Sequence, residues 1–272
     1  MKPEISIIVP MYNSKLFLDR SLKSCTNQDF NGDVQVVLVN DGSTDNTLNI
    51  AERFIKKNKS TNRKFDLYSQ DNQGASATRN FGVSIAESDN IFFLDSDDYI
   101  EREAITEATK VLNSRNDIGL VYSDHRKVKP SGEPTMDRIK NDFSLPELLT
   151  GMYLGHFRAM PKHVFDEVGG FDKNLTHSED YDLILKVATQ GHKIIHVPKI
   201  LYNYVSNDQS LALGNGGFER IVKGGQKAIR NAFKRLGLEE EVEFGKQWKT
   251  DDTVTRYLTD KQVHHYLDKI KK

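Results

Sequence analysis

In the first hundred residues, short apolar runs alternate with stretches in which apolar residues recur every three or four positions. The apolar runs predict β-strands, and the stretches with the 3.6-residue period predict amphipathic helices. This alternation is typical of an α/β fold with a mostly parallel central sheet flanked by helices. Strands are predicted at 5–10, 34–39, 65–69 and 91–95, and helices near 15–27, 45–58, 75–86 and 101–114.

After residue 118 the pattern loses its regularity. Residues 125–142 form a long polar excursion, in which the sequence PSGEP is typical of a turn. Further strands are predicted at 119–124 and near 193–205, and an apolar stretch bounded by glycines covers 151–161. A helix is predicted to open at SEDYDL, and basic helices are expected in the C-terminal residues.

The chain shows neither an internal repeat nor a low-complexity linker, so we predict one compact domain followed by a C-terminal helical appendage. The domain is expected to cover residues 1–210, with a first part at 1–118 and a second part at 119–210. The appendage would be a basic helical extension at 211–272. With 272 residues, 37% of them hydrophobic, the chain can bury a sizeable core.

The composition excludes several classes of protein. No apolar run approaches the ~20 residues of a membrane-spanning helix, and the apolar stretch in MKPEISIIVP is too short for a secretory signal, so we expect a cytoplasmic protein. Cys25 is the single cysteine, which rules out an internal disulfide and a multi-cysteine metal site. Any bound metal ion must therefore take oxygen or histidine ligands.

The net charge of -1 argues against a protein that binds nucleic acid through a strong basic field. The two parts of the chain differ, however, because residues 211–272 hold 13 Lys and Arg against 9 Asp and Glu. Within this segment, IVKGGQKAIRNAFKRLG could form a basic amphipathic helix that contacts a membrane surface peripherally or faces an acidic acceptor. The alternative is a solvated helix whose apolar positions pack on the protein.

Polar, acidic or Gly-containing sequences follow all four predicted strands of the first hundred residues. Because ligands of such folds bind outside the carboxyl ends of the parallel strands, we expect these loops to meet at one binding site. The four sequences are PMYNS, NDGSTDNT, QDNQGASATRN and DSDD.

Three carboxylates follow the fourth strand within four residues, in the sequence DSDD. The pair Asp95 and Asp97 is suited to a hard divalent cation that takes its remaining ligands from water and from substrate phosphates. The alternative is a solvated turn or the N-cap of the following helix. Because these side chains repel one another, the sequence predicts a positive group close to them.

The second and third loops offer groups that could bind a nucleotide. Asp41 could accept the N–H of a uracil ring and Tyr12 could stack on the base, although Asp41 and Gly42 also fit an ordinary turn. Arg79 lies in a helical stretch after Gly74, where it could hold a diphosphate or pair with the aspartates. A plain surface arginine is the alternative.

Glu179 and Asp180 fall in the first turn of the helix that opens within HSEDYDL. The helix dipole favours their ionised forms, so a carboxylate is available to take a proton from an attacking hydroxyl group. Acidic residues at this position also serve as capping groups only, and the sequence leaves both interpretations open.

Taken together, these motifs resemble the successive signatures of family 2 glycosyltransferases, an inverting class with the Rossmann-like GT-A fold. The resemblance rests on ISIIVPMYNS, VNDGSTDNT, NQGASATRN, FLDSDD and VGGFD followed by SEDYDL, in this order over residues 4–205. It implies a nucleotide-sugar donor, usually UDP-linked, a divalent cation, Mn²⁺ or Mg²⁺, and a glycan or lipid-linked acceptor. Residues 1–118 would then bind the nucleotide, and residues 119–210 would supply the acceptor side and the base.

The resemblance also implies roles for individual residues. Asp97 and Asp95 would hold the metal, and Asp180, with Glu179 as its alternative, would be the general base. Arg79 would lie near the diphosphate. The implied donor-binding residues are Pro10, Tyr12, Asn13, Asp41, Gln73, Gly74, Arg79, Asp95 and Ser96.

One stretch departs from the family pattern. Many members carry an Arg and a His in the tyrosine-rich strand after the base helix, whereas YNYVSNDQS has Asn203 and Val205 near these positions. A histidine ligand from this strand is therefore not expected. His125 and His156 could line the acceptor cleft or could be structural.

Two rival classes fit the sequence less well. A sugar nucleotidyltransferase would need a Gly-rich basic loop straight after the first strand, and PMYNSK contains no glycine. An inactive nucleotide-sugar-binding module would be expected to lose the aspartate motif or the base, and this sequence has both. We therefore expect a metal-dependent, inverting glycosyltransferase.

Overall fold

The computed structural model describes residues 2–58, 63–206, 217–238, 242–244, 248–250 and 254–270. The strands of its main sheet are β1 (Ile5–Met11), β2 (Val34–Asp41), β3 (Arg63–Gln70), β4 (Asn90–Phe93), β5 (Tyr99–Ile100), β6 (Ile118–Val128), β7 (Pro134–Arg138), β8 (Arg158–Pro161) and β9 (Lys193–Val205). A small separate hairpin consists of β10 (Trp248–Thr250) and β11 (Val254–Arg256).

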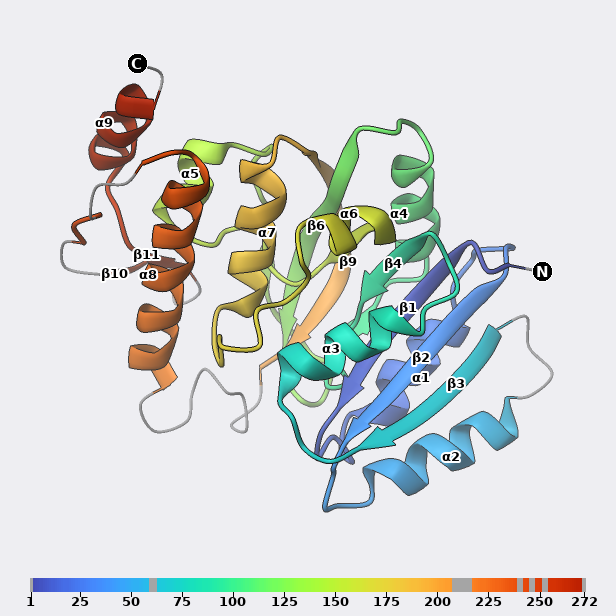
Figure 1. The fold of residues 1–272 in the computed structure, drawn as a ribbon. Coiled ribbons are helices and arrows are strands. Elements are labelled where there is room, and N and C mark those ends of the chain that lie inside the picture. The colour runs from blue at the N-terminus through green and yellow to red at the C-terminus, as the bar shows by residue number, and fades with distance from the viewer. Residues whose placement is uncertain are drawn as a thin grey trace.

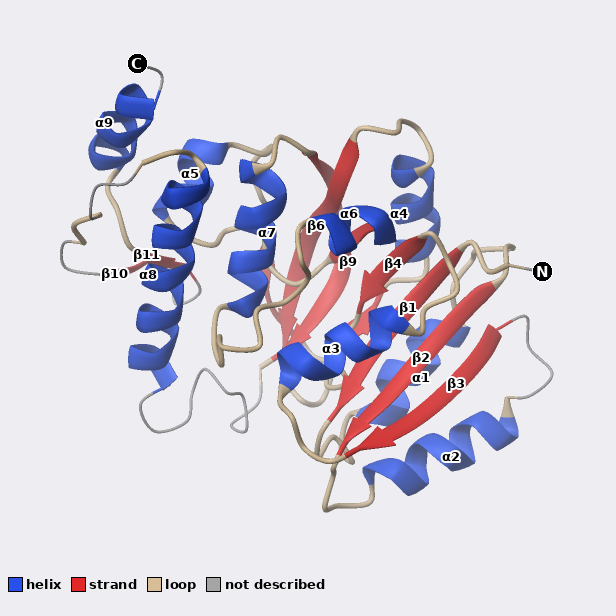
Figure 2. Cartoon of the chain, viewed as in Figure 1, coloured by secondary structure: helices blue, strands red, loops and turns tan. Residues whose placement is uncertain are grey.

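Helices pack on both faces of the main sheet (Figures 1 and 2). They are α1 (Leu18–Thr26), α2 (Thr47–Lys57), α3 (Ala75–Ser84), α4 (Ala104–Leu112), α5 (Leu145–Thr150), α6 (Lys162–Glu167), α7 (Glu179–Thr189), α8 (Gly217–Arg235) and α9 (Asp260–Ile270). The strand order is β3-β2-β1-β4-β8-β6-β9-β5, and β7 pairs with β6.

The N-terminal half of the sheet confirms the predicted βαβα series. β3, β2, β1 and β4 are parallel neighbours. β1 and β2 are buried along nearly their whole length because helices cover both faces, which explains their continuous apolar sequences. Ile7 and Val36 pack with α1, α2 and α4 on one face, whereas Ile8 and Val37 pack with α3 on the other.

The second half of the sheet is mixed rather than mostly parallel. β8 is antiparallel to both β4 and β6, and β5 is antiparallel to β9, whereas β6 and β9 are parallel. Residues 125–142 were expected as a polar excursion. Of these, residues 125–138 instead form the end of β6 and all of β7, joined by a turn in which Gly132 has a φ of 91°. Because β7 is an exposed edge strand, its sequence lacks the apolar pattern from which strands are predicted.

The segment predicted as a C-terminal appendage shares a hydrophobic core with the second half of the sheet. Ile229 and Phe233 of α8 are fully buried in the same cluster as Leu183 and Ile184 of α7. α9 packs against α5. The predicted boundary after residue 210 lies outside the described residues. Among the helices of the described segments, none is both long and apolar enough to cross a membrane.

Candidate active site

The ends of β1, β2 and β4 meet at one edge of the sheet, as the positions of the polar loops predict. Ser14, after β1, and Ser96, after β4, share a hydrogen bond with their Oγ atoms 2.6 Å apart. Asp41, at the end of β2, accepts a hydrogen bond from the backbone N–H of Gly74, just before α3, at 2.9 Å. The loops after these strands are therefore joined by direct contacts.

Arg79 lies buried at the centre of this edge, in α3. Its Nη2 donates to Asp95 Oδ1 at 2.7 Å, and its Nη1 donates to Glu179 Oε1 at 2.8 Å. Burial disfavours its charge, but the carboxylates of Asp95 and Glu179 outweigh this effect and raise the pKa of Arg79 above its usual value. Arg79 therefore pairs with the aspartate motif and is not a surface arginine.

A second arginine, Arg158 in β8, completes the charge network. Its side chain is almost fully buried; its Nη1 donates to Asp180 Oδ2 at 2.7 Å, and its Nη2 lies 3.9 Å from Asp95 Oδ2. Asp95 thus contacts both arginines, and two guanidinium groups face the carboxylates of Asp95, Glu179 and Asp180. For Asp95, these cations supply the positive charge that the DSDD sequence predicts.

The ionisation of Asp95 and Glu179 differs. Burial raises the pKa of Asp95, but Arg79 and Arg158 outweigh it and lower this pKa to about 2. In Glu179 the effect of burial is the largest and raises the pKa, opposed by Arg79 and assisted by Asp180. Asp95 is therefore ionised at neutral pH, and Glu179 is the harder of the two to ionise.

Asp98, the last carboxylate of DSDD, is buried against β9. Its Oδ2 accepts a hydrogen bond from the Tyr202 hydroxyl at 2.8 Å, and its Oδ1 accepts one from the backbone N–H of Val205 at 2.8 Å. Burial, together with the charges of Asp97 and Asp95, raises the pKa of Asp98 well above its usual value. A cation close to these carboxylates would offset their repulsion.

Within the described residues, Asp95, Asp98 and His156 form a group that could hold a metal ion. Each offers one ligand atom, and the three atoms lie within 4.8 Å of one another. Burial, followed by the charge of Arg158, lowers the pKa of His156 to about 4, so the imidazole is neutral at pH 7 and can act as a ligand. Of the two ligands expected from the sequence, this group contains Asp95 and does not contain Asp97.

The loop after β1 is fixed by Asn13, which has a left-handed φ of 50°. Its Oδ1 accepts hydrogen bonds from the backbone N–H groups of Thr44 at 2.9 Å and Asp45 at 3.3 Å, which ties this loop to the loop after β2. Asparagine tolerates this backbone conformation better than most residues. Tyr12, next to it, has 52% of its surface exposed and can be reached by a planar ligand, and Pro10 lies within β1.

Asp41 is engaged by the loop in front of α3. Its Oδ1 accepts hydrogen bonds from the backbone N–H of Gln73 at 2.9 Å and from Gln70 Nε2 at 2.8 Å. Gly74 supplies a third N–H and has a φ of 86°, a conformation that favours glycine. Asp41 therefore positions Gln73 and Gly74, and the expected contact with a base would use its remaining lone pairs.

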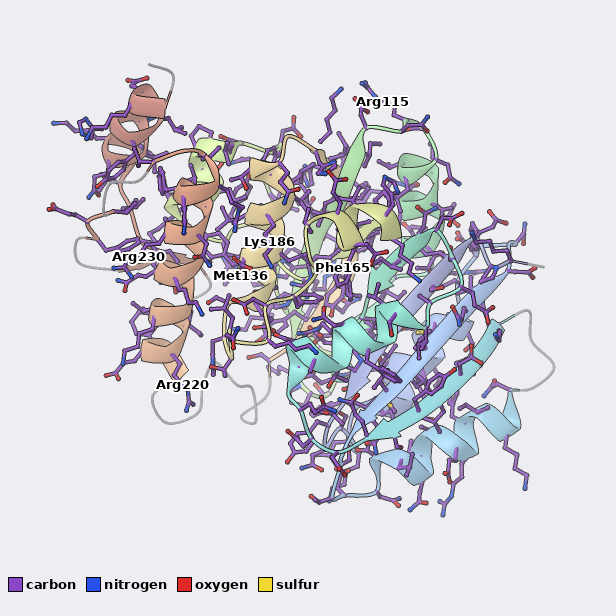
Figure 3. All side chains as sticks on the ribbon, in the orientation of Figure 1. Arg115, Met136, Phe165, Lys186, Arg220 and Arg230 are labelled. Atoms are coloured by element: carbon purple, nitrogen blue, oxygen red, sulfur yellow. The ribbon has the colours of Figure 1, made fainter. Side chains whose placement is uncertain are left out.

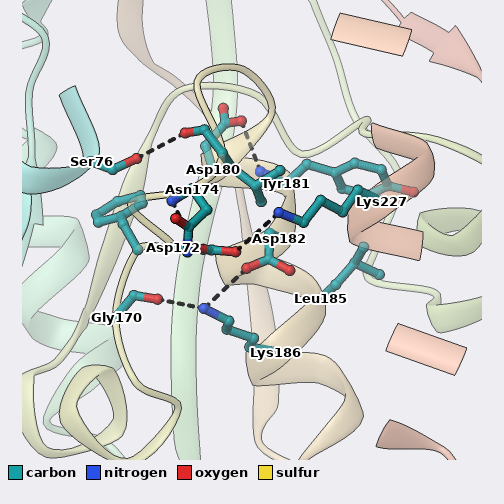
Figure 4. A network of polar contacts seen from close by, with 12 residues as sticks. Ser76, Gly170, Asp172, Asn174, Asp180, Tyr181, Asp182, Leu185, Lys186 and Lys227 are labelled. Carbon is teal, nitrogen blue, oxygen red and sulfur yellow. Dashed lines mark hydrogen bonds and ion pairs between the residues drawn. The ribbon is translucent and has the colours of Figure 1, made fainter. Parts of the chain in front are cut away.

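The loop with the sequence VGGFD contacts both α3 and α7. Asn80 of α3 donates to the Phe171 carbonyl at 2.9 Å and accepts a hydrogen bond from the Phe171 N–H at 3.0 Å. Lys186 of α7 donates to the Gly170 carbonyl at 2.8 Å and pairs with Asp182 at 3.0 Å (Figure 4). The loop thereby fixes the relative positions of α3 and α7, which carry the arginine and the acids of the site.

The strand that departs from the family pattern contacts other parts of the protein. Asn203 Nδ2 donates to Glu101 Oε1 at 2.9 Å. The two histidines expected near an acceptor lie together, since the rings of His125 and His156 meet edge to face with centroids 5.4 Å apart. His156 also stacks on Tyr204, with ring centroids 4.3 Å apart. His156 is therefore held between aromatic rings of β6 and β9.

Sequence reasoning did not identify Arg158, and it gave Asp98 and His156 no part in metal binding. Arg158 opens the strand RAMP, which is otherwise apolar and wholly buried. A charge in a buried strand needs a partner, so this position carried a usable signal. His156 carried no such local signal, because its neighbours come from strands that are distant in sequence.

Comparison with known families identifies similar proteins. The model of the family described as "Glycosyl transferase family 2" matches residues 6–170. Over 241 residues the chain is 33% identical to a hyaluronan synthase of Pasteurella multocida. The aligned region covers 87% of this chain and 24% of that protein. It is 34% identical over 218 residues to a chondroitin synthase of Pasteurella multocida (strain Pm70), with coverage of 78% and 22%. The chain thus spans about a quarter of the length of these two relatives.

Solved structures share the fold. TarS of S. aureus in complex with UDP matches with a TM-score of 0.64 and 23% identity, covering 88% of this chain and 67% of that chain. The mannosyltransferase PcManGT from Pyrobaculum calidifontis, in complex with GDP-Man and Mn2+, matches with a TM-score of 0.61 and 18% identity, covering 89% and 77%. These similarities confirm the GT-A fold.

Proposed function

The chain belongs to glycosyltransferase family 2, and from this membership we propose that it transfers a sugar from a nucleotide-sugar donor to a hydroxyl group of a glycan or lipid-linked acceptor. The observation that carries this proposal is the network in which Arg79 and Arg158 join Asp95 to Glu179 and Asp180. It brings a strand-end carboxylate and two candidate bases into one site. A module that only bound nucleotide sugars would not need the second pair of acids.

The proposed donor is a UDP-sugar. Two similar structures of TarS hold UDP and UDP-GlcNAc, whereas PcManGT holds GDP-Man. Tyr12 has an exposed ring on which a base can stack. Asp41 is a carboxylate that already accepts hydrogen bonds from three N–H groups, and its remaining lone pairs can accept the N–H of uracil. Gln73, Gly74 and Asn13 shape the loops around these two residues.

The residues at the site fit a divalent cation. The carboxylate oxygens and the imidazole nitrogen of the group suit Mn²⁺, and carboxylates with water suit Mg²⁺. Because both oxygens of Asp98 are engaged by β9, we assign Asp95, His156 and the adjacent Asp97 as the ligands. When bound, the cation neutralises charge on the departing nucleotide.

Asp180 is the better placed of the two acids to act as the general base. Each acid pairs with one arginine, Asp180 with Arg158 at 2.7 Å and Glu179 with Arg79 at 2.8 Å, but the Asp180 side chain is 29% exposed against 16% for Glu179. Arg158 holds the Asp180 carboxylate at the first turn of α7. Asp180 takes the proton of the acceptor hydroxyl group while the oxygen of that hydroxyl group attacks the anomeric carbon of the donor sugar. Because this is a single displacement from the face opposite the nucleotide, the anomeric configuration inverts.

The two parts of the domain divide this work. The donor-side residues Tyr12, Asn13, Asp41 and Arg79 all lie within 1–118, the proposed nucleotide-binding part. Arg158 and the acids of α7 lie within 119–210, the proposed acceptor part. The shared site lies where the two parts meet.

Calorimetric titration with UDP, GDP, CDP and dTDP, each with and without Mn²⁺, tests the donor half of the proposal. We expect UDP to bind most tightly and to require the metal ion. Tighter binding of GDP would overturn the donor assignment. Failure of every nucleotide to bind, with or without metal, would overturn the proposal of a transferase.

A further inference from the structure

α8 carries a single row of positive side chains, which we call the basic row. From residue 220 to the end of α8, every exposed residue is a lysine or an arginine. Their spacing of three and four residues places them along one face of the helix. The row extends over about 21 Å, with a cation every ~5 Å. Its members are Arg220, Lys223, Lys227, Arg230 and Lys234.

The opposite face of α8 is closed off by the core. Ala228, Ile229, Ala232 and Phe233 are fully buried in the large hydrophobic cluster. Phe218, in the first turn, is exposed to 38%. A helix that binds at a lipid interface inserts a continuous apolar face into the lipid, whereas the apolar face of α8 packs against the rest of the protein. The exposed row therefore offers charge with little accessible apolar surface.

The first turns of α8, where the basic row starts, pack against the residues that directly precede the acids of the active site. The Ser178 hydroxyl, one residue before Glu179, donates to the Ile221 carbonyl at 3.1 Å. Gly224 packs so closely on the His177 carbonyl that a Cβ atom would lie 2.3 Å from that oxygen. Figure 3 shows Arg220 near the start of α8, at the lower end of the helix in this view, and Arg230 farther along the helix.

The sequence of α8 contains a single acidic residue, Glu219, so the helix itself supplies little negative charge to offset the basic row. Lys227 lies 3.9 Å from Asp172, and the guanidinium of Arg230 lies 4.8 Å from the centroid of the Phe244 ring. A linear ligand with regularly spaced negative groups would match such a row.

We propose that the basic row binds a linear anionic polysaccharide and leads its end toward Asp180. This inference rests on the proposed function and adds the chemical class of the acceptor. The narrow row, its start in the part of α8 that packs on residues 177 and 178, and the buried apolar face together favour an extended polyanion over a membrane surface. The contacts are electrostatic, so binding weakens as salt screens the charges.

The test uses the full chain and fluorescently labelled hyaluronan oligosaccharides, with neutral dextran and vesicles of phosphatidylglycerol and phosphatidylcholine as comparison probes. The test variant is Lys223→Gln/Lys227→Gln/Lys234→Gln. The matched control is Arg53→Gln/Lys56→Gln/Lys57→Gln, which removes three exposed cations from α2, a helix packed on β2 and β3. UDP binding is measured on each protein.

We expect the wild type and the α2 control to bind the hyaluronan probe, and the α8 variant to bind it about 10-fold or more weakly, as three exposed ionic contacts are lost. Equal binding by the α8 variant and the wild type would overturn the inference. So would binding of the wild type to the anionic vesicles and not to hyaluronan, which would identify a membrane surface. If UDP binds but hyaluronan does not, this inference alone fails; if UDP also fails to bind, the proposed function fails with it.

Discussion

Arg158 donates from Nη1 to Oδ2 of Asp180 at 2.7 Å, across 22 residues of sequence. The arginine lies on β8, next to the strand that ends before Asp95, and the aspartate lies in the first turn of α7. A rigid, buried cation therefore orients the carboxylate that we propose as the base. Because Arg158 also faces Asp95 at 3.9 Å, the same side chain relates the base to the donor side.

Replacing Arg158 by lysine should separate its charge from its geometry. A lysine keeps the charge but cannot present two nitrogens in a fixed plane, so it cannot face both aspartates. We expect Arg158→Lys to lower kcat by about 100-fold with little change in UDP affinity, because misplacement of a base affects the chemical step. Steady-state kinetics and calorimetry measure the two effects. Unchanged kcat in this variant would show that the contact is structural only.

The matched variant Arg158→Met keeps the volume and removes the charge. It leaves Asp180 without a cationic partner and Asp95 with Arg79 as its single arginine, so we expect the free energy of unfolding to fall by about 3–5 kcal/mol. Urea denaturation measures this loss. A stability equal to that of Arg158→Lys would contradict the view that the charge is required in the buried network.

The two acids of α7 should respond differently to neutral replacements. Asp180→Asn removes the proposed base, and we expect transfer to fall by about 100-fold or more while UDP binding is kept. Glu179→Gln removes one partner of Arg79 and should have a smaller effect on kcat. A larger loss in Glu179→Gln than in Asp180→Asn would exchange the two assignments.

The carboxylates of DSDD should separate into a ligand and a structural residue. Asp97→Asn should abolish the response of activity to Mn²⁺. Asp98→Asn should keep the metal response, and it should lower the free energy of unfolding by about 1–3 kcal/mol, because the Tyr202 hydroxyl and the Val205 N–H then compete for one acceptor. Loss of the Mn²⁺ response in Asp98→Asn alone would assign the ligand to Asp98.

Cys25 gives a pH-dependent prediction outside the site. It is fully buried in α1, and burial raises its pKa from 9.0 to about 12. Between these pH values the folded protein keeps the thiol proton that the unfolded chain releases, so the folded state binds more protons and stability falls as pH rises from 9 toward 12. Cys25→Ala should make this alkaline fall less steep.

The same burial makes Cys25 a probe of unfolding. We expect a thiol reagent at pH 8 to label the native protein only as fast as the protein opens, and to label it rapidly in urea. Because the chain has one cysteine, the signal comes from α1 alone. Fast labelling of the native protein would contradict the burial of this side chain.

The sequence predicts the first half of the fold well because its signals are local. The apolar runs of β1 and β2 and the polar residues after them are contiguous in sequence, and parallel strands bring their ends together at one edge. The pairing of Arg79 with Asp95 follows the same logic, since Arg79 lies in the helix after β3 and Asp95 follows β4, and both strands belong to the parallel half of the sheet. These parts needed no knowledge of distant contacts.

The second half could not be predicted in the same way. The antiparallel insertion of β8 between β4 and β6 brings Arg158 into the network. Because β6 also pairs with β9, the same insertion brings His156, two residues before β8, against Tyr204. Both depend on strand pairs that are far apart in sequence and that single-chain patterns do not encode. β7 was missed because an exposed strand has no apolar pattern to detect.

The core shared by α7 and α8 has a consequence for how the protein opens. Ile229 and Phe233 pack with Leu183 and Ile184, so loss of α8 would expose the apolar face of the helix that begins with the acids. We expect the backbone amides of both helices to exchange hydrogen for deuterium in one cooperative event. A chain cut near residue 210 would then lose protection in α7 as well, since the placement of the acids depends on a segment that supplies none of them.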